Sequence, residues 1–328
     1  MIKNKTILIF GGTGSLGYEL NKRYIDNNKI YNFSRDENKH WEMKLYFHNH
    51  KNMNFIIGNV NDKTIVSQSI KRINPHIIII ASAMKHIDQC EINTSESIKT
   101  NLLGTQNITD SIENDLSVLT NLETVVFVSS DKACSPINNY GLCKALSETI
   151  IVEKAHYIPN IKFVNVRYGN VLNSRGSIIP LLHKIGKDPN ISDFKLTNEK
   201  MTRFVMTLEN SVDLIEYAII NGESGDTIIP KLISMNVKDL IEIFAEKYNK
   251  NIMTTGLRSG EKILESLINE TQSGRVIKAT SDYMHIKSVI KYPNILNENI
   301  KDYNSKLNPL TKEDLKKYLQ ELNLLNDS

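Results

Sequence analysis

Short apolar runs alternate with stretches of helical spacing through the first half of the sequence, and no other feature limits the fold as strongly. The runs are rich in Ile and Val, which is typical of strands covered by helices on both faces of a sheet. The alternating order predicts an α/β fold with a doubly wound parallel sheet. The predicted strands are Thr6–Phe10, Ile30–Phe33, Phe55–Ile57, His76–Ala81, Thr124–Ser129 and Phe163–Arg167, and the clearest helices are Ser15–Asn27, Ser95–Asn114 and Tyr140–His156.

The alternation breaks up after about Gly169, where short strands, turns and helices mix. We therefore expect residues 1–169 to form the sheet domain and residues 170–328 to form mainly a smaller lobe. Residues 206–227 are expected to return to the sheet domain. A charged helix, Thr311–Asn323, is expected at a solvated edge.

Composition excludes several classes of protein. Of the 328 residues, 40% are hydrophobic and 23% are charged, which is ordinary for a globular protein. The net charge of +3 is too small to indicate a nucleic-acid-binding surface. Apolar stretches such as Ile77–Ala81 are too short to span a bilayer, and Met1 leads into a strand without a signal peptide. Three cysteines without a CxxC pair suit a reducing compartment. We expect a cytoplasmic protein with no membrane or nucleic-acid partner.

A glycine-rich loop follows the first predicted strand and opens the first helix. Gly11, Gly14 and Gly17 have the spacing G-x-x-G-x-x-G. Glycine lets the backbone turn tightly and approach a pyrophosphate, while the helix N-terminus supplies N–H donors. The loop predicts a Rossmann-type domain that binds a dinucleotide.

The end of the second predicted strand indicates which dinucleotide is bound. NAD enzymes usually place an acidic residue there, to hold the ribose 2′-hydroxyl. Here Ser34 and Arg35 come first, and Arg can bind a phosphate through two hydrogen bonds. NADP is therefore favoured over NAD, although Asp36 follows directly.

Tyr140 and Lys144 form a Y-x-x-x-K pair at the start of a predicted helix. The i, i+4 spacing puts both side chains on one helix face. An ammonium beside a phenol lowers the phenol pKa from about 10. The tyrosine could then take a proton from a sugar hydroxyl while hydride leaves for nicotinamide.

Asp131 and Lys132 lie just beyond the fifth predicted strand, at the sheet edge where ligands bind in such folds. An epimerase needs only oxidation and re-reduction at one carbon, whereas a dehydratase also needs a base for the C5 proton and an acid for the departing 6-hydroxyl. Asp131 and Lys132 could supply this pair. Lys132 must be uncharged to act as the base, and desolvation with neighbouring cations, Lys85 and Lys144 among them, would favour that form.

Other reactive side chains have simpler interpretations. His40, His48 and His50 lie in a polar stretch, without metal-ligand spacing on any clear face, and are expected at the surface. Cys134 and Cys143 flank the Tyr140 segment but have no accompanying base or metal ligands. No metal site is predicted.

These motifs, taken together and in order, resemble the C5-inverting UDP-N-acetylglucosamine 4,6-dehydratases, a branch of the extended short-chain dehydrogenases. The resemblance covers roughly Lys5 to Glu270. The stretches that carry it include GGTGSLG (11–17), SRDE (34–37), MKH (84–86), IKTNLLGT (98–105), SDKA (130–133), PIN (136–138), VRYGNV (166–171), SRGS (174–177), MTRF (201–204) and Arg258 with GEK (260–262).

The resemblance implies a tightly bound, recycled NADP, UDP-N-acetylglucosamine as substrate, and a homo-oligomer, dimer or hexamer. Hydride would leave C4 and return to C6, and water would be lost across C5 and C6. Lys132 would return a proton to the opposite ring face, giving the L-configured 4-keto-6-deoxy sugar; the retaining glucose-nucleotide dehydratases typically carry Glu at this position. The implied cofactor contacts are Gly11, Thr13, Gly14, Ser15, Leu16, Gly17, Ser34, Arg35, Asp36, Glu37, Lys39, Asn59, Val60, Ala81, Ser129, Tyr140, Lys144 and Val171. The implied substrate contacts are Lys85, Ser130, Asn170, Arg175, Gly176, Ser177, Ile178, Met201, Arg203, Arg258 and Glu261, and the catalytic residues are Asp131, Lys132, Tyr140 and Lys144.

Three alternatives stay open. A sister group that couples dehydration to further epimerisation carries Met in place of Tyr140. An epimerase on another UDP-sugar would have no use for Asp131 and Lys132. A non-catalytic NADP-binding sensor commonly lacks the Tyr, the Lys or the acid–base pair, and all four side chains are present here.

Overall fold

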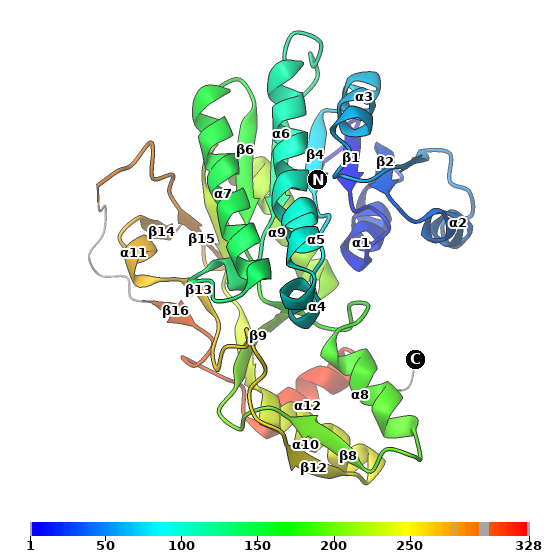
Figure 1. Ribbon diagram of the computed structural model, residues 1–328, viewed down its shortest axis with the longest axis vertical. Coiled ribbons are helices and arrows are strands. Elements are labelled where there is room, and N and C mark those ends of the chain that lie inside the picture. The colour runs from blue at the N-terminus through cyan, green and yellow to red at the C-terminus, as the bar shows by residue number, and fades with distance from the viewer. Residues whose placement is uncertain (1, 279, 295–301, 327–328) are drawn as a thin grey trace.

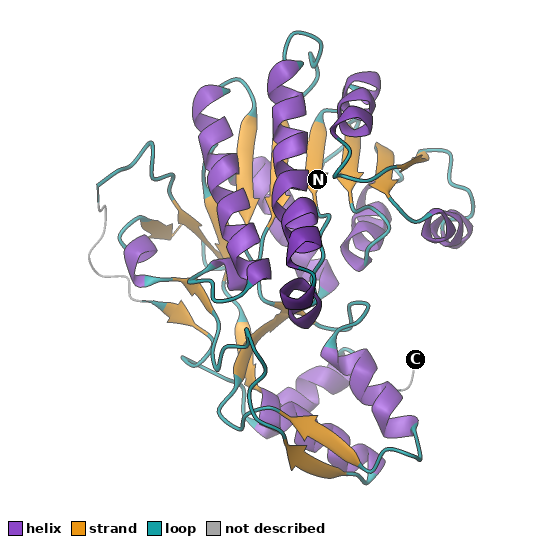
Figure 2. Ribbon diagram, viewed as in Figure 1, coloured by secondary structure: helices purple, strands orange, loops and turns teal. Residues whose placement is uncertain are grey.

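The computed structural model describes residues 2–278, 280–294 and 302–326. Its largest element is a nine-stranded sheet with helices on both faces (Figures 1 and 2). The strand order is β14-β15-β10-β6-β5-β4-β1-β2-β3, and all strands run parallel except β15, which pairs antiparallel with both β10 and β14. The bounds are β1 Thr6–Phe10, β2 Lys29–Ser34, β3 Met53–Ile57, β4 Ile77–Ile80, β5 Thr124–Val128, β6 Lys162–Val166, β10 Thr227–Pro230, β14 Val276–Lys278 and β15 Tyr283–Ile286.

The doubly wound parallel sheet predicted from the sequence is confirmed. All six predicted strands are present, with ends shifted by at most two residues. The strand order reverses between β1 and β4, and ligands bind at this point in open α/β sheets. The glycine loop lies directly after β1, at that position.

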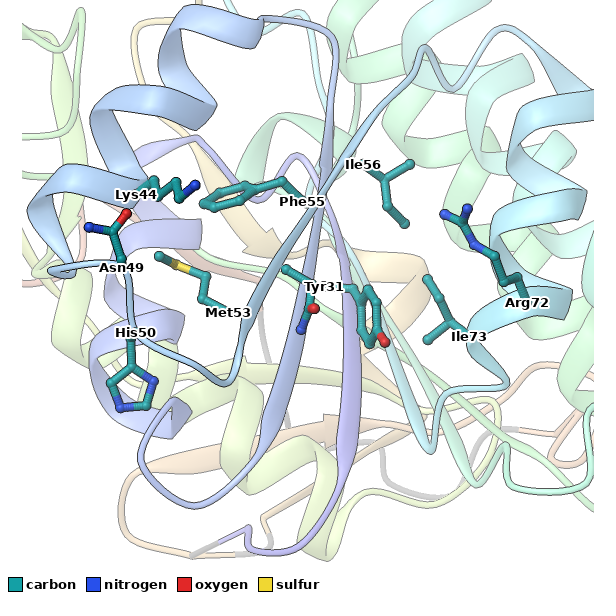
Figure 3. Close-up of a pocket in the computed structure, with 10 residues that line it drawn as sticks. Tyr31, Lys44, Asn49, His50, Met53, Phe55, Ile56, Arg72 and Ile73 are labelled. Carbon is teal, nitrogen blue, oxygen red and sulfur yellow. The ribbon is translucent and has the colours of Figure 1, made fainter.

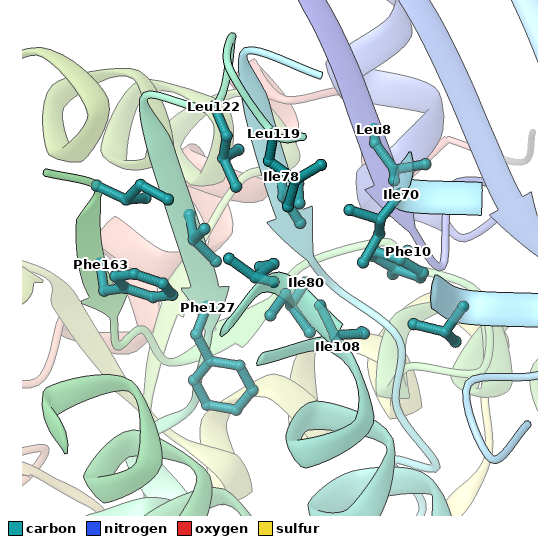
Figure 4. Packing of buried hydrophobic residues seen from close by; sticks show 14 of the residues in the cluster. Leu8, Phe10, Ile70, Ile78, Ile80, Ile108, Leu119, Leu122, Phe127 and Phe163 are labelled. Carbon is teal, nitrogen blue, oxygen red and sulfur yellow. The ribbon is translucent and has the colours of Figure 1, made fainter. Parts of the chain in front are cut away.

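Helices cover the two faces of the sheet according to the alternation of side chains along the strands. Leu8 and Phe10 of β1 pack with α3, α6 and α7, whereas Ile7 and Ile9 pack with α1 and α9. Figure 4 shows the first of these two cores, which includes Ile70, Ile108 and Phe163. The helices of this domain are α1 Ser15–Tyr24, α2 Glu37–Tyr46, α3 Lys63–Ile73, α4 Ile87–Ile92, α5 Thr94–Ile98, a π-helical turn η1 Lys99–Leu103, α6 Gly104–Asn114, a 3₁₀ turn η2 Asp131–Ala133, α7 Asn139–Tyr157 and α9 Leu208–Asn221.

A smaller lobe with its own core lies below the sheet in Figure 1. Its helices α8, α10 and α12 pack through residues such as Leu182, Phe244 and Leu315. The remaining bounds are β7 Asn170–Val171, α8 Ile178–Lys187, β8 Asp193–Leu196, β9 Thr202–Met206, β11 Ile233–Asn236, α10 Val237–Tyr248, β12 Asn251–Thr254, β13 Ser266–Ile268, α11 Glu270–Ser273, β16 Tyr303–Asn304 and α12 Lys312–Glu321.

The large sheet takes in more of the C-terminal half than the sequence indicated. Helix α9, within residues 206–227 that were expected to return to the sheet domain, packs on α1 and on β5, β6 and β10. Strands β10, β14 and β15 also join the sheet, although β14 and β15 lie in the range assigned mainly to the lobe. They are short and partly antiparallel, so no strand–helix alternation marks them in the sequence. In the part of the chain that the structure describes, no helix combines the length and apolarity that crossing a bilayer requires.

Candidate active site

The glycine loop is packed so closely that side chains are excluded at most of its glycines. A Cβ on Gly11, whose φ is +87°, would lie 2.9 Å from the backbone of Ala81, and a Cβ on Gly17 would lie 1.9 Å from the carbonyl oxygen of Gly12. Gly14 forms the N-cap of α1 and would meet only the Gly11 carbonyl oxygen, at 3.3 Å. The turn therefore leads directly into the first N–H groups of α1, from Ser15 and Leu16 on. This arrangement fits a dinucleotide diphosphate.

Side chains at the end of β2 lie next to this loop. The Thr13 hydroxyl donates to Ser34 Oγ at 2.9 Å, and His40 Nε2 lies 2.6 Å from the same oxygen. His40 is only 5% exposed, so the expectation of a surface histidine was wrong. Its ring packs at 5.0 Å from that of Phe55, a contact that the polar sequence around His40 does not reveal.

Asp36, which weighed against NADP in the sequence, has a structural role at the start of α2. Its carboxylate caps the helix by accepting from the Lys39 backbone N–H at 3.2 Å, and it pairs with the Lys39 ammonium at 3.3 Å. This backbone hydrogen bond is the main cause that lowers the pKa of Asp36. Arg35 and Glu37 are exposed beside it.

Two further predicted cofactor residues, Asn59 and Val60, follow β3. Asn59 Oδ1 accepts from the Asn61 backbone N–H at 3.1 Å, and Val60 is buried against Gly104. Ser129, at the end of β5, is also buried, and its hydroxyl donates to Glu148 at 2.5 Å. Val171 lies in β7, paired with Met206 of β9.

Tyr140 and Lys144 lie on one face of α7, but Lys144 makes other contacts than the sequence suggested. Its ammonium donates to the Val128 carbonyl oxygen at 2.8 Å and lies 4.4 Å from the centroid of the Phe127 ring. Burial raises the pKa of Tyr140, and the neighbouring Ser130 hydroxyl acts against this. The lowering of the Tyr140 pKa by Lys144 stays a prediction.

Asp131 and Lys132 form an ion pair in η2, directly after β5. Lys132 Nζ lies 2.8 Å from Asp131 Oδ1 and 3.0 Å from Asn170 Oδ1. Asp131 is fully buried, and its second oxygen, Oδ2, has no hydrogen-bond partner among the described residues. The structure thus places a carboxyl oxygen and an amine side by side at the carboxyl edge of the sheet.

The sequence analysis missed a second carboxylate at this site. Glu265, 2% exposed at the start of β13, has Oε1 3.8 Å from Lys132 Nζ and Oε2 3.3 Å from Lys262 Nζ. The predicted cationic neighbours of Lys132 are engaged elsewhere, since Lys144 bonds Val128 and Lys85 donates to the Arg175 carbonyl oxygen at 2.7 Å. The neighbours of Lys132 are therefore carboxylates rather than cations. In the sequence, the second carboxylate is visible only as Glu265 itself, the last residue of the GEK-x-x-E stretch 260–265.

The loop from Ser174 to Ser177 lies across the glycine loop. The Arg175 backbone N–H donates to Ser15 Oγ at 3.0 Å, its guanidinium donates to the Thr13 carbonyl oxygen at 3.3 Å, and it lies over the Tyr18 ring at 4.7 Å. Gly176 has φ +71°, and Ser177 and Ile178 begin α8. Residues predicted to contact the substrate are thus brought onto the predicted cofactor loop.

Three of the predicted substrate contacts, Met201, Arg203 and Arg258, lie in or beside the smaller lobe and have different surroundings. Met201 is 4% exposed in the core of the smaller lobe, and Arg203 donates to the backbone carbonyl oxygens of Thr202, Lys262 and Ile263. Their side chains therefore support the lobe, and a contact of either with the substrate stays a prediction. Arg258 has a side chain 68% exposed and is paired with Glu261 through its Nε at 3.0 Å.

A hollow elsewhere on the surface is separate from these residues. It measures about 340 Å³ and lies along β2 and β3, at the outer edge of the sheet (Figure 3). Tyr31, Phe55 and Arg72 are among the residues that line it, and none of the predicted site residues is. No group of three or more possible metal-ligating side chains occurs among the described residues.

We expect the stability of the protein to respond to pH through Lys144. Burial lowers the pKa of Lys144 to about 8, although Glu148 and Cys143 act in the other direction. A lysine in the unfolded chain keeps its proton up to about pH 10.4, so between about 8 and 10 the unfolded state binds more protons and the free energy of unfolding rises with pH. The gain should approach about 1 kcal/mol per pH unit.

The measurement is urea unfolding of the wild type and of Lys144→Met at several pH values in this window. Buried thiols and phenols also titrate in this window, but both proteins contain them. The difference between the two free energies of unfolding therefore reports the contribution of Lys144. Lys44→Met, at an exposed lysine, is the control and should change nothing. Parallel pH curves for the wild type and Lys144→Met would contradict the burial effect.

Comparison with known proteins agrees with this geometry. A family model described as polysaccharide biosynthesis protein matches residues 7–288. A Campylobacter jejuni protein named UDP-N-acetylglucosamine 4,6-dehydratase (inverting) is 36% identical over 89% of this chain and 85% of its own length. A Rickettsia bellii protein named UDP-glucose 4-epimerase is also 36% identical, over 84% of this chain and 81% of its own.

A solved structure titled Pen from Bacillus thuringiensis has a TM-score of 0.89 and 31% identity, and covers 98% of both chains. The similarity therefore spans the sheet domain and the smaller lobe together. The glycine loop, Tyr140 with Lys144 and the Asp131–Lys132 pair all lie within the residues that the family model matches. On these grounds the chain belongs to the polysaccharide biosynthesis protein family.

Proposed function

We propose that this protein is an inverting UDP-N-acetylglucosamine 4,6-dehydratase. The observation that carries the proposal is the Asp131–Lys132 pair, 2.8 Å apart at the carboxyl edge of the sheet and on the turn that packs against α7 and Tyr140. An acid and a base are what water loss requires beyond the oxidation at C4. The 36% identity to the C. jejuni relative over most of both chains supports the same reaction and substrate.

A nicotinamide cofactor would be held by the glycine loop and the end of β2. We propose NADP, because Ser34 and Arg35 come at the end of β2, where such folds receive the ribose, and Asp36 is engaged as a helix cap. A nicotinamide held there would supply the hydride acceptor for C4 of the sugar and the hydride donor for C6. Lys144, fixed on the Val128 carbonyl, would hold the ribose beside it.

Tyr140 would take the proton of the sugar 4-hydroxyl. Burial opposes its phenolate, so the site needs positive charge from Lys144 and from the oxidised cofactor to make the transfer favourable. The Ser130 hydroxyl, which is near the phenol and donates to Asp131 Oδ1 at 2.9 Å, would orient it.

Lys132 and Asp131 would perform the elimination. A proton moving from Lys132 Nζ to Asp131 Oδ1 over 2.8 Å turns the ion pair into a neutral amine and a neutral acid. The amine then removes the C5 proton, and the acid protonates the 6-hydroxyl as the C6–O bond breaks and water leaves. Lys132 returns its proton to the opposite face of C5, which gives the L-arabino configuration.

The smaller lobe and its loops would hold the sugar nucleotide. Lys85, Asn170 and the loop of Arg175 lie beside the catalytic pair and the glycine loop. Exposed Arg258 suits the diphosphate of UDP. The division into a cofactor domain (1–169 with 206–227) and a substrate lobe, the homo-oligomer and the cytoplasmic location stay predictions.

A second candidate function is 4-epimerisation of a UDP-sugar, which the name of the R. bellii relative favours. Such a reaction needs Tyr140 and the cofactor but has no step for Asp131 or Lys132. Both candidates can be separated by their products.

The deciding experiment is proton NMR of the protein with UDP-N-acetylglucosamine in D₂O, without added cofactor. We expect a 4-keto-6-deoxy product that carries deuterium at C5 and has L-arabino couplings. The cycle is redox-neutral, so no reduced nicotinamide should be consumed in a parallel absorbance assay. A D-xylo product would keep dehydration but exclude inversion by Lys132, and UDP-N-acetylgalactosamine would identify an epimerase.

A further inference from the structure

Thr13, Ser34 and His40 form a chain of hydrogen bonds beside the proposed cofactor. Thr13 comes from the glycine loop, Ser34 from the end of β2 and His40 from the first turns of α2. Ser34 Oγ accepts from the Thr13 hydroxyl at 2.9 Å and lies 2.6 Å from His40 Nε2. The Ser34 hydroxyl is thus the centre of these hydrogen bonds. The direction of its own O–H follows from which neighbouring groups donate to its oxygen.

The surroundings of His40 determine which ring nitrogen carries hydrogen. Its Nδ1 is buried and has no hydrogen-bond partner among the described residues, and the ring packs on Phe55. Burial lowers the pKa of His40, while Asp36 and Glu37 act in the opposite direction, so the neutral ring is favoured. A buried N–H without an acceptor is rarer than an unpaired acceptor, so hydrogen belongs on Nε2.

The Ser34 hydroxyl is then left with one free donor. A serine oxygen offers two acceptor positions and one O–H. Thr13 and His40 Nε2–H fill the two acceptor positions, so neither of them can receive the Ser34 proton. Since Ser34 is only partly buried, this proton is available to an acceptor outside the protein.

We propose that His40 is a positioning residue that makes Ser34 an outward hydrogen-bond donor to the 2′-phosphate of NADP. The inference rests on the NADP preference in the proposed function and deepens it. A phosphate oxygen accepts a charge-assisted hydrogen bond from a fixed donor, whereas the 2′-hydroxyl of NAD gains only a neutral one. His40 therefore contributes to the choice between the two cofactors without touching either.

Binding constants for NADP⁺ and NAD⁺, measured by calorimetry, test this without reference to turnover. The quantity of interest is the ratio of the two dissociation constants, which is insensitive to the fraction of folded protein. We expect His40→Leu to reduce the NADP⁺ preference about 10-fold, as for one hydrogen bond to a charged group. His40→Gln, whose amide N–H can still donate to Ser34, should keep most of the preference.

A double-mutant cycle separates positioning from general packing. If His40 acts through Ser34, His40→Leu should have no further effect on the ratio once Ser34→Ala is present. A packing role predicts additive effects. NAD⁺ affinity should fall less than NADP⁺ affinity in every variant, because only a neutral hydrogen bond is lost, and measurable NAD⁺ binding serves as the folding control.

The ligand-free protein gives a second readout. ¹⁵N NMR of histidine-labelled protein, with the His40 signals assigned from their loss in His40→Gln, should show hydrogen on Nε2 and none on Nδ1. The opposite tautomer would overturn the inference. If the wild type prefers NADP⁺ but His40→Leu leaves the ratio of dissociation constants unchanged, or adds to the effect of Ser34→Ala, the role of His40 is overturned and the NADP assignment stands. If the wild type binds both cofactors equally, the NADP assignment is overturned as well.

Discussion

Lys132→Ala is expected to abolish water loss from UDP-N-acetylglucosamine, with a fall in turnover of about 10²–10⁴-fold, the range for a lost general base. The amine that removes the C5 proton is gone, and Asp131 loses the partner from which it receives its proton. Deuterium incorporation at C5 should disappear together with the 4-keto-6-deoxy product. Oxidation at C4 uses Tyr140 instead, so reduced-nicotinamide absorbance should still develop when substrate is added.

The matched control is Lys262→Ala. Lys262 is also a lysine beside Glu265, at 3.3 Å, but its ammonium donates to the Cys134 carbonyl oxygen and does not lie next to Asp131. Its replacement should leave deuterium exchange at C5 in place. Turnover of Lys132→Ala close to that of the wild type would remove the role assigned to this lysine.

Glu148→Leu is expected to destabilise the protein by about 3–5 kcal/mol, the cost of leaving one partner of a buried ion pair alone. Glu148 binds the guanidinium of Arg167 through two hydrogen bonds, of 3.0 and 2.5 Å, and accepts from the Ser129 hydroxyl. Arg167 is 1% exposed, so no water could replace the carboxylate. Urea unfolding and the thermal midpoint measure the loss.

The double variant Glu148→Leu with Arg167→Met provides the control. It removes both charges, and replacement of a buried pair by apolar side chains of similar size often restores stability. Part of the loss should remain, because Arg167 also donates to the Leu267 carbonyl oxygen and to Gln272 Oε1. A double variant less stable than Glu148→Leu would contradict an origin in the unpaired charge.

The sheet domain could be predicted because its signals are local. Apolar runs such as Ile77–Ile80 and the glycine spacing need only neighbouring residues to be interpreted, and both are where the sequence placed them. The Tyr140 and Lys144 spacing also gave a correct helix face. It could not give the partner of the Lys144 ammonium, because the Val128 carbonyl is supplied by β5.

The errors concern residues whose surroundings come from distant parts of the chain. His40 sits in a polar stretch, yet Phe55 of β3 covers its ring. The contacts of Met201 and Arg203 with the lobe core and with backbone carbonyl oxygens also depend on distant residues, and the sequence alone does not indicate them. Glu265 was missed since nothing near it in the sequence indicates that β13 lies against η2.

The position of Glu265 along the chain separates two events during synthesis. The glycine loop, Ser34 and Tyr140 all precede β6, whereas Glu265 follows α10 and β12 of the smaller lobe. The second carboxylate beside Lys132 is therefore added only after most of the sheet and much of the lobe have been made. The reactive lysine acquires its final surroundings only once residue 265 has been added to the chain.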